Sequence, residues 1–181
     1  MKNQAIKQMC TRVKTVEVIS LKSGEKWIGN GEAWYTAGAL SALDTDGILQ
    51  AFDITDDKRA KMNVEERHAF PQGMHEDTVE DEEPLQMSGF GIVMHGRHLM
   101  PLRTADGILY FDTDYMKPFS NKNGDVCLCE RKDDVGNSYI VIKEGFVVKG
   151  IVRPYVDILT DHFVSALDAL ARHTRLALEN L

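Results

Sequence analysis

The sequence predicts an α+β protein in which mainly antiparallel strands, in one sheet or two, pack against a long C-terminal helix. Between Pro154 and Leu181, large apolar residues recur at steps of three, four or a multiple of these, which is the spacing of one helix stripe. Many earlier segments are rich in β-branched residues and are separated by turn signals. Helical spacing between residues 44 and 62 adds short helices to this plan.

The predicted C-terminal helix has more apolar residues than one stripe can hold. The stripe itself consists of Leu159, Phe163, Leu167, Leu170, Leu178 and Leu181. Val164 and Leu176 lie off this stripe. The helix is therefore predicted either to be buried on more than one side or to contact a second copy of the chain through Val164 and Leu176.

The composition is typical of a soluble globular protein. The chain has 181 residues, of which 43% are hydrophobic and 27% are charged. No apolar run approaches the ~18 residues of a membrane helix, and the first residues contain no signal-peptide core. We therefore expect a cytoplasmic protein without membrane contact. The three cysteines have no framework spacing and are expected to be reduced thiols.

The net charge of −7 is distributed unevenly. Residues 1–30 hold six basic and two acidic residues, whereas residues 31–90 hold four basic and fourteen acidic residues. A nucleic-acid-binding protein usually concentrates basic residues on one face, so nucleic-acid binding is not expected. The alternative is a contact through the basic N-terminal residues Lys2, Lys7, Arg12 and Lys14.

The N-terminal part is predicted to contain a hairpin followed by short helices. Residues 14–21 alternate as in a strand, and residues 26–35 form the returning strand, interrupted by Gly29-Asn30-Gly31 as a bulge or a second tight turn. Residues 1–10 are a short helix or a disordered lead. Asp44 or Thr45 caps a first short helix and Thr55 caps a second.

An acidic segment is predicted to divide the chain. Six of the eight residues from Glu76 to Glu83 are carboxylates, and charges this dense resist burial. We therefore predict an N-terminal part at 1–72, an exposed acidic loop at 73–88 and a β-rich part with the terminal helix at 89–181, together forming one compact domain. In the β-rich part, strands are expected at 89–95, 98–103, 108–112, 125–131, 139–142 and 146–152. Pro101 predicts that its strand lies at a sheet edge.

Two sets of residues are candidates for metal chemistry. Zinc would suit a His/Cys set, and a hard cation such as Mg²⁺ would suit aspartates at strand ends. The candidate ligands are His95, His98, Asp112, Asp114, Cys127 and Cys129. Alternating Cys residues in a strand are also a common core pattern, and aspartates commonly cap turns, so neither a metal nor a cofactor is expected.

The aromatic residues of the N-terminal hairpin are candidates for partner binding. Trp27, Trp34 and Tyr35 lie beside flexible glycines, as aromatic anchors of a binding surface often do. A hairpin that covers a core would use the same residues, so both interpretations stay open.

The sequence contains none of the common nucleophile or phosphate-loop motifs. Gly-x-Ser-x-Gly, Gly-x-x-x-x-Gly-Lys-[Ser/Thr] and His-Glu-x-x-His are all missing. We therefore expect a non-catalytic interaction or assembly module that binds a protein partner or itself, such as an accessory protein of a bacterium, its phage or another mobile element. The alternative is a small metal-assisted hydrolase or nuclease that uses Asp112, Asp114 and His95 or His98.

Overall fold

The protein forms two compact units, each made from two stretches of the chain. The structure, a computed structural model, describes residues 2–79, 81–119 and 126–179, with the backbone alone for residues 176–179. The first unit combines Met1–Glu82 with Met116–Arg153, and the second combines Glu83–Tyr115 with Pro154–Leu181. The first boundary falls inside the acidic segment, and the chain later returns to the first unit.

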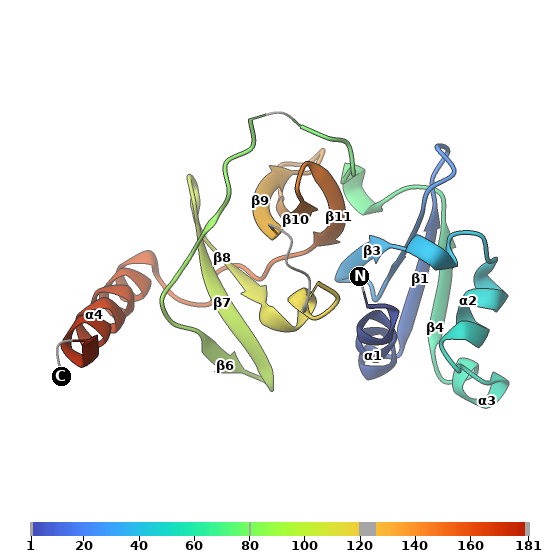
Figure 1. Ribbon diagram of the computed structural model, residues 1–181, viewed down its shortest axis with the longest axis horizontal. Coiled ribbons are helices and arrows are strands. Elements are labelled where there is room, and N and C mark those ends of the chain that lie inside the picture. Colours follow the sequence, from blue (N-terminus) through green and yellow to red (C-terminus); the bar gives the residue numbers. More distant parts are fainter. Residues whose placement is uncertain (1, 80, 120–125, 180–181) are drawn as a thin grey trace. The chain divides into compact units, whose positions relative to one another are not determined.

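The first unit is built around a seven-stranded sheet with the strand order β4-β1-β2-β3-β11-β10-β9 (Figure 1). Its strands are β1 (Thr15–Ser20), β2 (Lys26–Gly29), β3 (Ala33–Thr36), β4 (Asn63–Arg67), β9 (Val126–Lys132), β10 (Ser138–Glu144) and β11 (Val147–Val152). Its helices are α1 (Asn3–Val13), α2 (Thr45–Ala51) and α3 (Asp56–Arg59), with short 3-10 turns at Gly38–Leu40 and Pro71–Gly73. Asp44 caps α2 as predicted, because its side chain accepts a 2.8 Å hydrogen bond from the Gly47 N–H.

The interruption at Gly29-Asn30-Gly31 is a second tight turn that separates β2 from β3. The side chain of Asn30 accepts hydrogen bonds from the backbone N–H groups of Glu32 and Ala33, and Gly31 adopts φ +89°. Gly29 itself has no room for a side chain, since a Cβ there would lie 2.3 Å from a ring carbon of Trp34. Both observations explain why glycine and asparagine occupy this turn.

Strand β4 was not predicted from the sequence. It is a charged edge strand that pairs in parallel with β1, with Thr15 opposite Asn63 and Val16 opposite Val64. Every other pair of neighbouring strands in this sheet is antiparallel. Acidic side chains at an exposed sheet edge discourage pairing with other chains, but they remove the alternation by which a strand is recognised.

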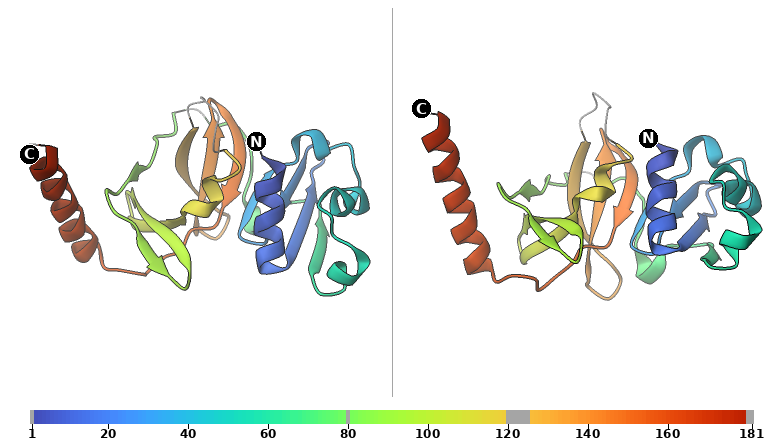
Figure 2. Two further views of the ribbon diagram at one scale, coloured as in Figure 1. Left: turned by 60° about the horizontal axis from the view of Figure 1, so that its bottom comes forward. Right: turned by 90° about the horizontal axis from the view of Figure 1, so that it is seen from below.

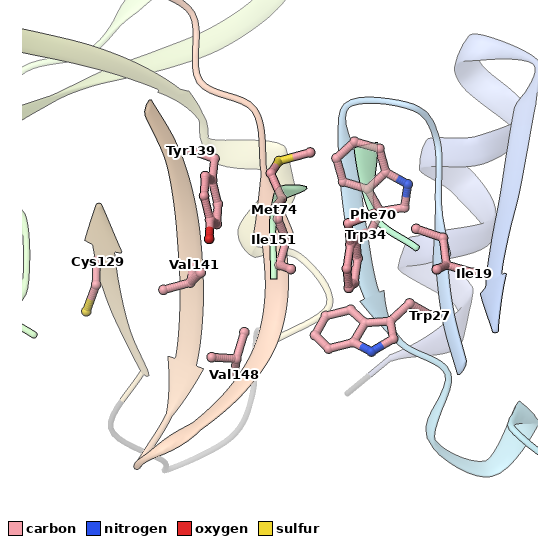
Figure 3. Packing of buried hydrophobic residues seen from close by; sticks show 10 residues of the cluster. All are labelled: Ile19, Trp27, Trp34, Phe70, Met74, Cys129, Tyr139, Val141, Val148 and Ile151. Atoms are coloured by element: carbon pink, nitrogen blue, oxygen red, sulfur yellow. The ribbon is translucent and has the colours of Figure 1, made fainter. Parts of the chain in front are cut away.

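The core of the first unit follows a row of cross-strand partners. Trp34 lies opposite Ile151, Ile151 opposite Val141, and Val141 opposite Cys129, so one row crosses β3, β11, β10 and β9. Figure 3 shows the tryptophan rings of this cluster facing Phe70, whose ring meets that of Trp27 edge-on at 5.1 Å. The other face of the sheet is covered by α1, where the Cys10 thiol donates to the Gly29 carbonyl.

The second unit contains a four-stranded sheet centred on β7 (Figure 1). Its elements are β5 (Gln86–Met87), β6 (Ile92–Met94), β7 (Arg97–Thr104), β8 (Gly107–Asp112), a 3-10 turn at Thr113–Met116 whose last residue is assigned to the first unit, and α4 (Asp161–Glu179). Strand β8 pairs along one edge of β7, and β5 and β6 share the other edge. The prediction that Pro101 marks an edge strand is therefore wrong. Pro101 falls between the stretches of β7 that pair with β6 and β5, so its missing N–H interrupts neither ladder.

The C-terminal helix begins at Asp161, seven residues later than the predicted start at Pro154. The connecting residues are extended instead, and Tyr155 exchanges two 2.8 Å backbone hydrogen bonds with Tyr110 of β8. The predicted mixed α/β class, with largely antiparallel sheets and a C-terminal helix, is confirmed. None of the helices in the described part of the chain has the length and apolarity needed to cross a bilayer.

Candidate interaction surface on the C-terminal helix

One side of α4 is fastened to the sheet of the second unit. Val164 is completely buried in a cluster with Leu99 of β7 and Tyr110 of β8. One turn further along the helix, Asp168 is also buried. These two residues define the inner face of α4.

Asp168 holds this inner face through a set of hydrogen bonds. Its carboxylate accepts a 2.6 Å hydrogen bond from Arg103, a 3.0 Å bond from the Gly89 N–H and a 3.3 Å bond from the Ser88 hydroxyl. Burial raises the pKa of Asp168, but the bonds from Arg103 and Gly89 outweigh this effect and hold the pKa below its ordinary value. Asp168 is therefore a charged group that fixes the rotation of α4 about its own axis.

The outer face of α4 consists of Phe163, Ala166 and Leu170. Phe163 is 51% exposed and Leu170 is 63% exposed, while Ala166 between them is also open to solvent. In both views of Figure 2, α4 lies at the border of the second unit, with the strands of that unit on one side of it. Two large apolar side chains on one open helix face form a candidate contact surface for another chain.

The sequence-based assignment of the two sides of the helix needs a correction. Phe163 and Leu170 belong to the stripe predicted to face the core, yet they are exposed. Val164, predicted to meet a second copy, is instead buried against its own sheet. The reason is the Asp168–Arg103 pair, which turns the inner face toward the strands. Leu176, the other predicted contact, lies outside the residues whose side chains the structure describes.

The predicted aromatic binding surface is also corrected by the structure. Trp27 and Trp34 are buried in the core under Phe70 and Met74, and Tyr35 is buried on the opposite face of the sheet. The Trp34 indole N–H donates a 2.7 Å hydrogen bond to the buried carboxylate of Glu17. Because both faces of this sheet are covered, none of the three aromatic residues is available for a partner.

The candidate ligands of the second unit have structural roles. Asp112 is buried, lies 3.4 Å from the Arg97 guanidinium and accepts a hydrogen bond from the Asp114 N–H, as an aspartate at a turn often does. His95 and Gly96 form the two-residue turn between β6 and β7, both with positive φ. The side chains of His95 and His98 are exposed.

The histidine, aspartate and cysteine candidates do not form a metal-binding group among the described residues. Cys127 and Cys129 lie on β9 of the first unit, whereas the four other candidates belong to the second unit. No three His, Cys, Asp or Glu side chains within residues 2–79, 81–119 and 126–175 are grouped closely enough to hold a metal ion. Burial raises the pKa of Cys129 to about 11, so that thiol is protonated at neutral pH.

One residue of the acidic segment is buried instead of solvated. The Glu82 carboxylate accepts hydrogen bonds of 2.6 and 3.0 Å from Arg131 and one of 2.9 Å from Lys143. All three side chains are less than 10% exposed. Burial raises the pKa of Glu82, but the hydrogen bonds and positive charges of Arg131 and Lys143 together lower it by more. The net pKa is therefore below its ordinary value. This ion triad ties the segment to β9 and β10.

These ionic contacts could not be predicted from local sequence patterns, because the partners are far apart in the sequence. Glu82 and Arg131 are 49 residues apart, and Asp168 and Arg103 are 65 residues apart. The one local signal is that Asp168 directly follows Leu167 of the predicted stripe. A carboxylate next to an apolar stripe can form a buried ion pair or can be exposed to solvent, so its position in the sequence does not distinguish the two cases.

Comparison with known proteins found no matching family model, no matching curated protein and no matching solved structure. The fold and its surfaces are therefore the basis for a functional proposal.

Proposed function

We propose that this protein is a non-catalytic assembly module that pairs with a second copy of itself through the outer face of α4. The supporting observation is the exposure of Phe163 and Leu170 on the side of the helix away from Asp168. An exposed apolar face is informative when a polar group of the same element is buried. Here the helix buries a carboxylate and leaves a phenylalanine and a leucine in solvent.

We call the hydrogen bonds from Arg103, Gly89 and Ser88 to the Asp168 carboxylate the Asp168 clamp. This clamp explains why the helix does not rotate to bury its larger apolar residues. Rotation would break the hydrogen bonds that the Asp168 carboxylate accepts from Arg103 and the Gly89 N–H, and it would remove Val164 from its buried cluster. Burying Phe163 and Leu170 is worth roughly 1.5–3 kcal/mol for each side chain. A second chain can supply that burial without disturbing the clamp.

The spacing of the outer face suits an antiparallel pair of identical helices. If a twofold axis passes between Ala166 and Leu167, Phe163 of one copy lies opposite Leu170 of the other, and the reverse contact is formed as well. Ala166 then lies opposite Leu167, next to the axis. A small residue at this point allows the two helices to approach closely.

The charges on the helix favour the same face. Asp161, Asp168, Arg172 and Arg175 lie on the side of the helical wheel away from Phe163 and Leu170. Two copies with a net charge of −7 each repel one another, so a face without carboxylates is where they can approach most closely. With only a few apolar side chains per copy, we expect a weak and reversible dimer with a Kd of roughly micromolar magnitude.

Light scattering coupled to size-exclusion chromatography tests this proposal. The wild-type protein is expected to shift from monomer toward dimer over a roughly hundredfold range of concentration around the expected Kd. Phe163→Glu places a charge in the contact and should give a monomer throughout that range. A wild-type protein that stays monomeric at every concentration would refute the proposal.

A matched control separates the helix contact from a general effect of added charge. Val93 on β6 of the same unit is 69% exposed, so Val93→Glu introduces the same charge on another apolar surface position. We expect this variant to dimerise like the wild type. Equal loss of dimer in both variants would show that net charge, and not the outer face of α4, controls association.

A further inference from the structure

A second candidate surface, in the first unit, is a pocket lined by positively charged side chains. Lys7, Lys14, Lys58 and Lys61 line a pocket of about 370 Å³ together with Thr11 and Met62, and we call it the lysine pocket. Small-ligand pockets occupy roughly 300–1,000 Å³, so this pocket can hold a compact ligand. Four lysines in one pocket are unexpected in a chain with a net charge of −7.

The fold brings these residues together from two distant stretches of sequence. Lys7 and Thr11 lie on α1, and Lys14 ends that helix. Because β1 and β4 are parallel neighbours, the residues that precede them lie at the same end of the sheet. The N–H of Asn63, the first residue of β4, donates a 2.8 Å hydrogen bond to the Lys14 carbonyl and holds Lys61 and Met62 beside the end of α1.

Only part of the positive charge in the lysine pocket is neutralised by the protein. Lys7 forms a 2.5 Å ion pair with Asp53, and Lys58 donates a 3.1 Å hydrogen bond to the backbone carbonyl of Asp53. Lys14 and Lys61 have no hydrogen-bond or ion-pair partner for their ammonium groups among the described residues. The four lysines that line the pocket carry a charge of +4, and the Asp53 carboxylate beside Lys7 offsets one of these charges.

The position of Lys14 adds a separate observation. This residue caps the C-terminus of α1 in the left-handed conformation, with φ 56° and ψ 36°. Glycine is the usual residue at such a cap because other side chains are strained there. A basic residue near a helix C-terminus interacts favourably with the helix dipole, but this effect does not require three more lysines around the same hollow.

We infer that the lysine pocket binds a small anion that carries a diphosphate group. Lysine ammonium groups are compact point charges that suit phosphate oxygens, and a diphosphate carries about the charge needed to neutralise the pocket. The side chain of Met62 and the lysine methylene groups offer apolar surface for the rest of such a ligand. This inference does not depend on pairing through α4.

Calorimetric titration with inorganic pyrophosphate tests the inference on the full-length protein. We expect saturable binding with one site per chain. In Lys14→Gln and Lys61→Gln, each of which removes an ammonium group without a protein partner, the affinity should fall about tenfold. Lys22→Gln, at an exposed turn of the same unit, should leave the affinity unchanged.

Parallel titrations decide between sources of the phosphate group. A nucleoside diphosphate that binds at least as tightly as pyrophosphate supports a ligand with an organic portion, and inorganic phosphate should bind more weakly. Binding of a single-stranded oligonucleotide without pyrophosphate binding would overturn the inference in favour of a nucleic-acid surface. Absence of saturable pyrophosphate binding, or equal displacement by sulfate at the same ionic strength, would also overturn it.

Discussion

Arg103 of β7 donates a 2.6 Å hydrogen bond to the buried carboxylate of Asp168 on α4. This pair connects two elements that are distant in the sequence and determines which side of α4 faces the sheet. The apolar outer face of the helix is exposed as a direct consequence. The proposed assembly function thus depends on a polar contact on the opposite side of the same helix.

Replacing Asp168 by asparagine is expected to loosen α4 from the second unit. The variant keeps the shape of the side chain but removes the charge that faces Arg103, which should cost about 2 kcal/mol of local stability. Hydrogen–deuterium exchange of the α4 amides measures this effect directly, and exchange should be faster in Asp168→Asn. Asp157→Asn is the matched control because Asp157 is exposed and asparagine tolerates its positive φ. Equal protection of the α4 amides from exchange in the wild type and Asp168→Asn would contradict the stabilising role of the Asp168–Arg103 pair.

The ion triad at Glu82 predicts acid sensitivity of the first unit. The folded-state pKa of Glu82 lies below its ordinary value of 4.5, so its ionised form stabilises the fold at higher pH. This contribution is lost as the pH falls through the folded-state pKa. The difference in unfolding free energy between the wild type and Glu82→Gln should therefore be largest near neutral pH and shrink in acid. Urea denaturation at a series of pH values measures it.

A neighbouring carboxylate provides the comparison for this pH dependence. Glu83 is exposed, so Glu83→Gln should have nearly the same stability as the wild type at every pH. A pH-independent difference between the wild type and Glu82→Gln would show that the Glu82 carboxylate is not stabilised by its two cationic partners.

Gly29 should not accept a side chain. A Cβ at this position would lie 2.3 Å from a ring carbon of Trp34 and 2.4 Å from the Ala33 carbonyl oxygen. Since backbone and a packed indole must both move, Gly29→Ala is expected to lower the unfolding free energy by about 2 kcal/mol. Gly89→Ala is the control, because its nearest contact would be an ordinary 3.7 Å from Ala171. Thermal unfolding compares the two variants. Equal melting temperatures for Gly29→Ala and Gly89→Ala would contradict the close packing of Gly29 against Trp34 and Ala33.

The three cysteines should differ in reactivity. Burial raises the pKa of Cys10 to about 12 and that of Cys129 to about 11, so both remain protonated near neutral pH. Cys127 is only half-buried and should be alkylated first. Pulsed alkylation followed by peptide mass spectrometry assigns the order, and all three should react once the protein is unfolded. Labelling of Cys10 at the rate of Cys127 would contradict its burial.

Local patterns in the sequence predict most of the secondary structure. The hairpin at β1–β2, the capped helix α2, the strands from β6 to β11 and the C-terminal helix all follow from alternation, turn residues or helical spacing. Strand β4 does not, because its two consecutive glutamates break the alternation and its partner β1 lies more than forty residues earlier. Parallel pairing at such a distance leaves no local signal.

The candidate surface was harder to predict for a related reason. Helical spacing identifies an apolar stripe on α4, but it does not determine whether that stripe faces the chain's own sheet or solvent. The choice depends on Asp168 and Arg103, and the lysine pocket likewise depends on the long-range pairing of β1 with β4. Trp27 and Trp34 show the converse case, in which residues suited to binding are buried by Phe70.

Disulfide cross-linking through single introduced cysteines tests the proposed pairing most directly. In an antiparallel dimer with its axis between Ala166 and Leu167, the two copies of residue 166 are neighbours, whereas those of Thr174 are separated by roughly 22 Å along the helix axis. In a Cys127→Ser background, Ala166→Cys should give a covalent dimer under mild oxidation and Thr174→Cys should not. Absence of cross-linking at position 166, or equal cross-linking at both positions, would contradict antiparallel pairing through α4.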